Sequence, residues 1–420
     1  MKFIADFHLH SKYSRATSSQ MDLENLDKWA KIKGIKVLGT ADFTHPEWFR
    51  NLKEKLEPAE PGLFRIRNQE SGIKNNETRF ILTTEISCVY SRKGRVRKIH
   101  IIIFSPSFEV VEKINVQLGW IGNLKSDGRP ILGLDAKELA KIVLNASSEC
   151  LVIPAHAWTP WFAIFGSKSG FDSIEECFED YSKYIYSIET GLSSDPAMNW
   201  RLSALDKITL ISNSDSHSPS KIGREANVFD IEISYPAIAQ AIKNKDPQKF
   251  LYTIEFYPEE GKYHYDGHRN CGIKLSPKET KKYNGICPVC GKPLTVGVLN
   301  RVERLADREE GYLPEKRIPF KNLVPLGEII ADALGHNTGT KEVEKEYKNL
   351  IENFGSEFTI LLDVAKEDLE KATLPEIAEG IIRVREGKVI REAGYDGVYG
   401  KIRVFSKEEQ KELIRQETLF

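Results

Sequence analysis

The segment KFIADFHLHSKYS, residues 2–14, decides the prediction of the fold. Residues 2–7 form a short apolar run of a length that favours a buried β-strand. His8 and His10 follow at once, and both imidazoles leave on the same face because side chains alternate along an extended chain. Two imidazoles on one face can chelate one metal ion. The segment therefore predicts a strand that delivers metal ligands at its C-terminal end.

The same arrangement recurs along the first 245 residues, where short apolar runs alternate with predicted helices at residues 21–33, 135–147, 174–184 and 236–243. This alternation predicts the α/β class, with a mostly parallel sheet or barrel. In such folds the active site lies at the C-terminal ends of the strands. Residues that can bind metal stand there: Asp42 and His45 after 36–39, Glu85 and His100 in a hairpin of 79–89 and 97–104, His156 after 150–155, Glu189 in 185–189, and Asp215 and His217 after 208–213.

The predicted hairpin supplies a possible bridging ligand. If it turns at Lys93 and Gly94, Glu85 lies opposite Ile102, and His100 becomes its diagonal neighbour on the same face. A carboxylate in that position could bridge two metals about 3.5–4 Å apart, the spacing of two-metal phosphoester chemistry. Nitrogen and oxygen ligands suit Zn²⁺ or Mn²⁺, which would activate a water molecule for attack on phosphorus. We therefore expect a metal-dependent phosphoesterase.

Composition and charge limit which other classes of protein this chain can belong to. The chain has 420 residues, which favours two or three domains, and its net charge is −1, so nucleic-acid binding would need local basic patches. The densest patch is Arg92, Lys93, Arg95, Arg97 and Lys98. The longest apolar runs are strand-sized, far from the roughly 20 residues that cross a bilayer, and the N-terminus lacks a signal-peptide pattern. We expect a cytoplasmic protein without a membrane partner.

A cysteine cluster follows the first region. His268 and Cys271, then Cys287 and Cys290 in the sequence CPVCG, match the spacing of a structural zinc site. The fourth ligand could be His264 instead of His268. A site closed by four protein ligands contributes folding energy and leaves no open position for chemistry. The cluster therefore predicts one structural zinc.

Five motifs support a family resemblance. DFHLHSKYS, GTADFTH, the strand with Glu85, VIPAHAW and NSDSH resemble, in order, the motifs of the polymerase-and-histidinol-phosphatase (PHP) domain. The resemblance covers roughly residues 1–245 and implies a distorted (β/α)7 barrel with two or three divalent ions, Zn, Mn or Mg. It assigns His8, His10, Glu85 and Asp215 to one ion, Glu85, His100 and His156 to a second, and His217 to a third.

The chain departs from the PHP pattern in its second motif. The family usually has Thr-Asp-His there, whereas Phe43 follows Asp42, so Asp42 or His45 must substitute as a ligand. The family's additional histidine downstream of the first motif is also missing. The third metal is the one that these departures affect.

The whole chain is similar to the endonuclease Q family. The similarity rests on ETGLSSDPAMNWR at 189–201, HRNCG, CPVCGKPLTVGVLNRVERLADR and GYDGVYGKI. It implies a PHP barrel over residues 1–248, a zinc-binding ribbon domain over 249–312 and a mainly helical domain over 313–420. The implied activity is DNA repair: hydrolysis 5′ of deaminated bases (uracil, hypoxanthine, xanthine) and of abasic sites.

This resemblance extends the list of expected site residues. Asp195 joins Glu85 and Asp215 as a catalytic carboxylate, because it stands just past a strand within a family motif. A deaminated base has to leave the stack to be recognised, so an aromatic pocket is expected near the metals. Trp158, Trp161 and Phe171 are its candidates.

The expected partner is double- or single-stranded DNA that contains damaged bases. A sliding-clamp interaction cannot be read from the sequence. Two rival functions stay open: a small-molecule phosphatase of the histidinol-phosphate type, and a non-catalytic DNA-binding module that keeps only structural metals.

Overall fold

The computed structural model describes residues 1–67, 77–406 and 408–410. Its main feature is a mixed sheet whose strands pair in the order β15-β12-β11-β1-β2-β5-β4-β3, with β6, β7 and β8 joined through β5 and β6. The sheet strands are β1 (Lys2–Asp6), β2 (Val37–Gly39), β3 (Leu56–Pro58), β4 (Phe64–Ile66), β5 (Arg79–Arg92), β6 (Arg95–Ser105), β7 (Ile131–Leu132), β8 (Leu151–Pro154), β11 (Ala226–Asp230), β12 (Phe250–Glu255) and β15 (Phe320–Asn322).

The prediction of a mostly parallel sheet is wrong for several neighbours. The pairs β1–β2 and β2–β5 are parallel, but β1–β11, β11–β12, β5–β6 and β6–β8 are antiparallel. The long β5–β6 hairpin explains part of this, because a direct turn can only join antiparallel strands. Strands β9 (Ser187–Glu189) and β10 (Thr209–Ile211) form a separate parallel pair.

The hairpin has the predicted register. Its turn is at Lys93 and Gly94, both with positive φ, and Glu85 pairs with Ile102. His100 pairs with Ser87, two residues from Glu85, so the two side chains lie on the same face of the hairpin. This prediction is confirmed.

Alternate side chains of the strands meet in one interior apolar cluster. It contains Phe3, Ala5 and Phe7 of the first strand and its extension, with Ile102 and Ile153 among its other members. The intervening residues of the same strands face the helices in a second cluster. This two-sided burial explains the nearly continuous apolar runs within the strands.

Helices cover the outer face of the sheet, except for α7 (Tyr235–Asn244), whose buried residues belong to the interior apolar cluster. Helix α1 begins after Asp22, whose carboxylate accepts from the Asn25 amide, and ends at Gly34 with φ of 84°. The predicted helix 174–184 changes at Glu179, whose φ of 49° ends the α-helix and begins a 3-10 turn. The helices of this region are α1 (Leu23–Lys33), α2 (Pro46–Lys55), α3 (Phe108–Ile121), α4 (Ala136–Ala146), α5 (Ile174–Phe178), α6 (Pro196–Asn199) and α7 (Tyr235–Asn244).

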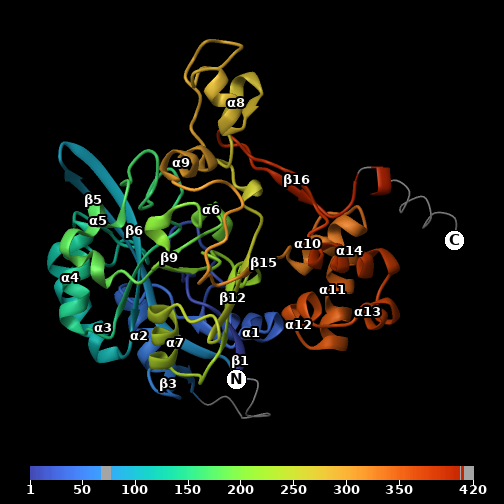
Figure 1. Cartoon of the computed structure of the whole chain (residues 1–420). Helices are drawn as coiled ribbons and strands as arrows, with labels where there is room; N and C mark the ends of the chain where they lie inside the picture. Colours follow the sequence, from blue (N-terminus) through green and yellow to red (C-terminus); the bar gives the residue numbers. More distant parts are fainter. Residues whose placement is uncertain (68–76, 407, 411–420) are drawn as a thin grey trace.

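The remaining chain forms two further parts, which Figure 1 shows beside the sheet. The segment with the cysteines contains β13 (Asp266–His268), β14 (Ile273–Leu275), α8 (Pro277–Lys282) and α9 (Val298–Leu305). The last part is mainly helical and contains α10 (Leu326–Ala333), α11 (Lys341–Phe354), α12 (Glu357–Leu362), α13 (Lys366–Ala372) and α14 (Pro375–Arg385), followed by the hairpin of β16 (Ile390–Glu392) and β17 (Lys401–Arg403).

The predicted domain limits do not coincide with the strand pairing. Strand β12 falls in the expected ribbon domain, yet it pairs with β11 of the main sheet. Strand β15 falls in the expected helical domain, yet it pairs with β12. The sheet therefore extends past both limits, because its edge is completed by a strand that returns after the cysteine segment.

In the part of the chain that the structure describes, no helix is both long and apolar enough to cross a membrane.

Candidate metal centre

Two segments that are far apart in the sequence meet at the end of β1. The amide of Phe7 donates to the side chain of Asn213 (2.9 Å), and the amide of His10 donates to the carbonyl of Ser216 (2.9 Å). Residues 7–10 therefore lie beside residues 213–216. Because Phe7 points into the interior apolar cluster, His8 and His10 point away from it, toward Asp215.

The first ligand group consists of His8, His10, Glu85 and Asp215, whose ligand atoms all lie within 4.8 Å of one another. The Nε2 atom of His10 is 3.0 Å from Oδ1 of Asp215 and 3.3 Å from Oε2 of Glu85. The Nε2 atom of His8 is 3.5 Å from the same Glu85 oxygen. Both histidines and Glu85 are almost fully buried.

The second group consists of Glu85, His100 and His156. The other oxygen of Glu85, Oε1, is 2.8 Å from Nδ1 of His100 and 3.1 Å from Nε2 of His156. Glu85 thus faces one group with each carboxylate oxygen. This is the arrangement that the sequence predicts for a bridging carboxylate.

The chemistry of these donors fits divalent cations. The buried Nε2 atom of His8 has no hydrogen-bond partner among the described residues. The Nδ1 atom of His100 and the Nε2 atom of His156 are only 3.1 Å apart, and both face Glu85 Oε1. Buried nitrogen atoms that converge with carboxylate oxygens are the donor set of borderline metal ions such as Zn²⁺.

The electrostatics of the groups also favour cations. Burial alone lowers the pKa of His8, but the carboxylates of Glu189, Asp215 and Glu85 outweigh it and raise that pKa well above its usual value. Burial opposes ionisation of Glu85, but His100, Arg129 and His8 hold its pKa well below the usual range. The centre therefore concentrates negative charge, and a metal ion that binds there competes with protons on the histidines.

Glu189 orients both groups from outside. Its carboxylate lies 3.0 and 3.1 Å from Nδ1 of His8 and accepts from the backbone amide of His156 (2.7 Å) and from Asn213 (2.9 Å). A carboxylate behind a ligating histidine fixes its ring orientation and makes it a stronger ligand. Glu189, which the sequence places at a strand end, is thus a supporting residue of the centre.

Asp42 has a similar supporting position. It is fully buried, lies 3.3 Å from Nδ1 of His10, and accepts from the amide and hydroxyl of Ser11 (2.7 and 2.6 Å) and from the hydroxyl of Ser14 (2.8 Å). It is not a member of either ligand group. The structure therefore places Asp42 behind His10, as an orienting partner, instead of beside the other ligands.

Two predicted histidines also lie outside the groups. His45 immediately precedes α2, and its ring stacks on Tyr13 with centroids 4.4 Å apart. His217 lies closer, with its ring 4.5 Å from that of His10, but its Nδ1 faces the backbone oxygen of Asp215 at 2.9 Å. Neither histidine therefore completes a ligand group among the described residues.

The structure gives Asp195 a different position from the expected one. Its carboxylate accepts from the amide of Met198 (2.9 Å) and caps the short helix α6. Burial raises the pKa of Asp195 to about 6, with Glu259 adding to the rise. It belongs to neither ligand group. A strand-end position did not suffice here, because the Asp-Pro pair that follows the strand begins a helix.

Arg129 is a member of the centre that sequence reasoning missed. Its Nη1 donates to Oε2 of Glu85 at 2.9 Å, and its side chain keeps 26% of its surface exposed. Gly128 brings this loop close, because a Cβ there would lie 2.2 Å from an Asp42 carboxylate oxygen and 2.3 Å from the Ser14 hydroxyl. The sequence signal was a Gly-Arg-Pro triplet, which is too common to single out.

The three aromatic residues expected to form a base pocket differ in their exposure to solvent. Trp158 is fully buried and donates to Asn199 (2.8 Å), and Phe171 is 1% exposed beneath the guanidinium of Arg97. Their ring faces are occupied by the core, so neither is open to a base. Trp161 is 49% exposed in the loop that follows His156.

The cysteine cluster forms in the expected way. His268, Cys271, Cys287 and Cys290 gather their ligand atoms within 4.8 Å of one another. Gly291, with φ of 70°, closes the knuckle, and its amide donates to the carbonyl of Cys287 (2.9 Å). The geometry selects His268 over His264, which is buried against Tyr265.

Charges in the knuckle support a thiolate site. Although burial opposes it, the backbone amides of Cys290 and Val289 lower the pKa of Cys287 to about 7. Two cysteines on one turn with a histidine and a third cysteine on the neighbouring hairpin are the donor set of a structural zinc ion.

Two solved structures of endonucleases match almost the whole chain. The chain matches the crystal structure of the lesion-specific endonuclease PfuEndoQ from Pyrococcus furiosus with a TM-score of 0.84 and 30% identity, over 98% of this chain and 99% of that one. It matches endonuclease Q, solved with a 27-mer duplex that carries an abasic lesion at the active site, with a TM-score of 0.83 and 31% identity over 98% of both chains.

Two sequence comparisons lead to another relative. Residues 325–388 match the family model of the MJ0043 C-terminal domain. The uncharacterized protein MJ0043 of Methanocaldococcus jannaschii is 35% identical over 255 residues, which is 59% of this chain and 31% of that protein. The chain thus covers about a third of this curated relative.

The mixed α/β fold and two histidine groups that share a carboxylate define a metal-dependent hydrolase centre. The near-complete match in fold, at 30–31% identity, is more specific. The chain belongs to the endonuclease Q family.

Paired substitutions test the two metal sites. Glu85→Gln should remove the cations of the centre and leave about one zinc per chain, because Glu85 faces both groups. Cys290→Ser should do the reverse and also lower the melting temperature, since a closed zinc site contributes to folding. Metal content is measured by elemental analysis after purification without chelator. Unchanged metal content in Glu85→Gln would contradict the assignment.

Proposed function

We propose that this protein is a DNA-repair endonuclease that hydrolyses the phosphodiester bond 5′ of deaminated bases (uracil, hypoxanthine, xanthine) and of abasic sites. The observation that carries the proposal is the pair of ligand groups sharing Glu85, in a chain that matches endonuclease Q over 98% of its length. That relative was solved with an abasic lesion at its active site. Its fold similarity supports DNA as the substrate here.

The ligands in this proposal are His8, His10, Glu85, His100, His156 and Asp215. Two or three divalent ions, Zn, Mn or Mg, would supply Lewis acidity and neutralise charge at the phosphoryl group. His217 is the nearest further histidine, at 4.5 Å between its ring and that of His10, and we propose it for a third ion. Glu189 and Asp42 hold the histidines in orientation from behind.

Arg129 provides the chain's own positive charge at this centre. Its partner, Glu85, would share its charge with the cations, and the guanidinium is partly exposed. A guanidinium can donate two parallel hydrogen bonds to the oxygens of one phosphate, and this fixes the orientation of the phosphate. We therefore propose that Arg129 contacts the phosphate that is cleaved.

Recognition of the lesion is assigned to the loop after His156. Trp161 is the aromatic residue of this loop with an exposed ring, and Nζ of Lys98 lies 5.5 Å from the ring centroid. Stacking of a base on such a ring contributes about 1–3 kcal/mol. We propose that Trp161 stacks on the extruded base or on its neighbour.

The proposal includes the architecture and the location implied by the family resemblance. These are closure of the strands into a distorted barrel, a zinc ribbon around the four-ligand cluster, a helical C-terminal domain, and a cytoplasmic protein. The shared interior cluster of alternate strand residues supports closure of the barrel.

The first experiment decides between the proposed function and its rivals. A labelled duplex with one uracil or abasic site is incubated with the enzyme and Mn²⁺, and in parallel with chelator. We expect a metal-dependent nick 5′ of the lesion that leaves 3′-hydroxyl and 5′-phosphate ends. Hydrolysis of p-nitrophenyl phosphate without nicking would favour a small-molecule phosphatase. Binding of DNA without either reaction would favour a non-catalytic module.

Arg129→Ala should lower kcat for nicking roughly 100-fold, the range found when one transition-state hydrogen-bond donor is removed. Arg129→Lys should recover only part of this loss, because an ammonium group lacks the paired donors of a guanidinium. Metal content is measured in the same samples. A loss of bound metal that parallels the loss of kcat would contradict a direct role at the phosphate.

Trp161→Ala should weaken binding of a uracil-containing duplex about 10-fold, while binding of undamaged duplex changes less, because stacking requires an extruded base. Trp120→Ala is the matched control, since Trp120 is 81% exposed on α3. Binding is measured by fluorescence anisotropy at constant salt. Equal effects of both substitutions would contradict base stacking by Trp161.

A further inference from the structure

A basic cavity of about 550 Å³ lies apart from the metal ligands. Its wall comes from four places: the start of β6, the loop of residues 166–172, helix α5, and helix α9 of the cysteine segment. The residues that line it are Arg95, Val96, Arg97, Gly166, Ser167, Lys168, Gly170, Phe171, Asp172, Glu176, Arg301 and Arg304.

Five cationic side chains and two carboxylates line this cavity. Arg301 has a structural role. It is buried and donates to the carbonyls of Phe165 and Phe171 (2.8 and 2.9 Å) and to Asp172 (2.6 Å). The pKa of Asp172 is lowered by that hydrogen bond, so its charge is already compensated. The remaining positive charge of the cavity is in excess.

Three of the cations have no ion-pair partner within 4.0 Å among the residues with defined positions. They are Arg95, Lys168 and Arg304, and all three are exposed. Each comes from a different part of the wall, so the chain gathers them only through folding. Like charges that are held together without partners repel one another, and a bound anion relieves that repulsion.

Buried donors of the wall are also unsatisfied. Arg97 is 7% exposed, stacks on Phe171 at 4.0 Å and donates through Nη1 to the carbonyl of Gly170, yet its Nε has no partner among the described residues. The hydroxyl of Ser167 is unpartnered as well. A buried donor without a partner costs about 1–3 kcal/mol, so such atoms favour binding of an acceptor-rich ligand.

The cavity is connected to the metal centre by two continuous backbone segments. Strand β6 carries Arg97 three residues before His100, about 10 Å away at 3.3 Å per residue. The loop that begins at His156 runs beside this strand: the amide of His100 donates to the carbonyl of Phe162 (2.9 Å), and the amide of Lys98 donates to that of Ser169 (3.4 Å).

We propose that this cavity binds a backbone phosphate of the DNA other than the one that is cleaved. The inference rests on the proposed function for its DNA ligand. Guanidinium groups and a lysine with excess positive charge match the oxygens of a phosphate, which carry no base identity. The contact positions the strand for the metal centre without reading its sequence.

The test removes the three unpaired cations together, in the variant Arg95→Ala/Lys168→Ala/Arg304→Ala. These side chains are exposed, so the fold should persist. Binding of a lesion duplex is measured across a range of salt concentrations. We expect Kd to rise at least about 10-fold, and the slope of log affinity against log salt to fall by about one for each lost phosphate contact.

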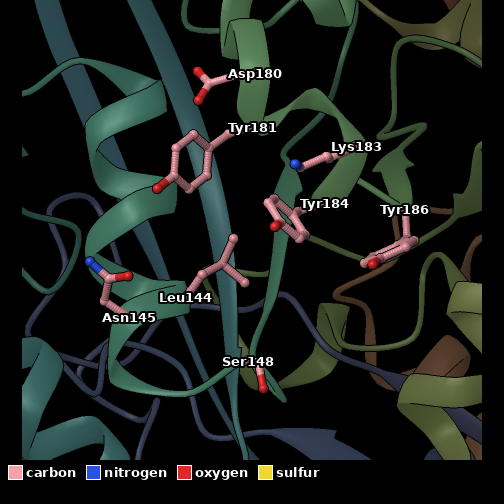
Figure 2. A pocket seen from close by; sticks show the side chains of 8 residues that line it. All are labelled: Leu144, Asn145, Ser148, Asp180, Tyr181, Lys183, Tyr184 and Tyr186. Atoms are coloured by element: carbon pink, nitrogen blue, oxygen red, sulfur yellow. The ribbon is translucent and has the colours of Figure 1, made fainter.

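The matched control removes the same charge elsewhere, in Lys113→Ala/Lys183→Ala/Lys207→Ala. Lys183 lines a different cavity of about 390 Å³, whose wall includes Tyr181, Tyr184 and Tyr186, as Figure 2 shows. Like the three cations of the basic cavity, these lysines are exposed. If both triple variants have the same affinity and salt slope, the basic cavity has no special role and the inference is wrong.

A second measurement separates this inference from the proposed function. Inorganic phosphate alone should raise the melting temperature of the wild-type protein more than that of the Arg95/Lys168/Arg304 variant. If the wild-type protein neither binds nor nicks lesion DNA, the proposed function fails and DNA is excluded as the ligand. A phosphate effect that depends on these three residues would then support a site for free phosphate, and its absence would overturn the cavity as a phosphate site altogether.

Discussion

The buried carboxylate of Glu85 is the constraint on which the rest of the centre depends. It is 1% exposed, and its two oxygens face two groups of histidines and Arg129 within 3.5 Å. A lone carboxylate at that depth would be neutral, whereas this one is held ionised by positive neighbours. A site of concentrated negative charge among neutral nitrogen donors is stable only when cations bind or the histidines take up protons. The hairpin register is therefore as important as the ligands, because a shift by one residue would turn Glu85 to the other face.

The supporting residues show how much of the fold serves this constraint. Glu189 and Asp42 each lie behind one histidine of the first pair, and each also accepts from a backbone amide, so ring orientation is coupled to the backbone. Gly128 lets the loop with Arg129 approach Asp42 more closely than any side chain would allow. These contacts are fixed by packing and by backbone hydrogen bonds, so the orientation of both histidines is set by the fold.

The cysteine segment is joined to the sheet at both of its ends and also by side-chain hydrogen bonds. The chain leaves the sheet after β12, forms the four-ligand cluster, and returns as β15 to pair with β12. Arg301 of α9 fixes this segment to the loop that begins at His156. A zinc ion in the cluster would therefore stabilise α9, which forms part of the wall of the basic cavity, although the ion would take no part in chemistry. Figure 1 shows this segment above the sheet, with the C-terminal helices to one side.

The sequence by itself determined which residues can bind metal and how the nearest of them are spaced. Alternation along a strand and the position of one turn were enough to predict His8 with His10 and Glu85 with His100. The spacing of two cysteines within one turn was enough to predict the knuckle. Only the tertiary structure decided which distant residues join them. Arg129 contacts Glu85, whereas Asp42, His45 and Asp195 lie outside both ligand groups. The tertiary structure also places His268, and not His264, beside the three cysteines. The strand directions and the limits of the sheet were also decided at that level. The physical reason is that a motif fixes the direction of its own side chains, while contacts between separate segments of the chain depend on how the whole core packs.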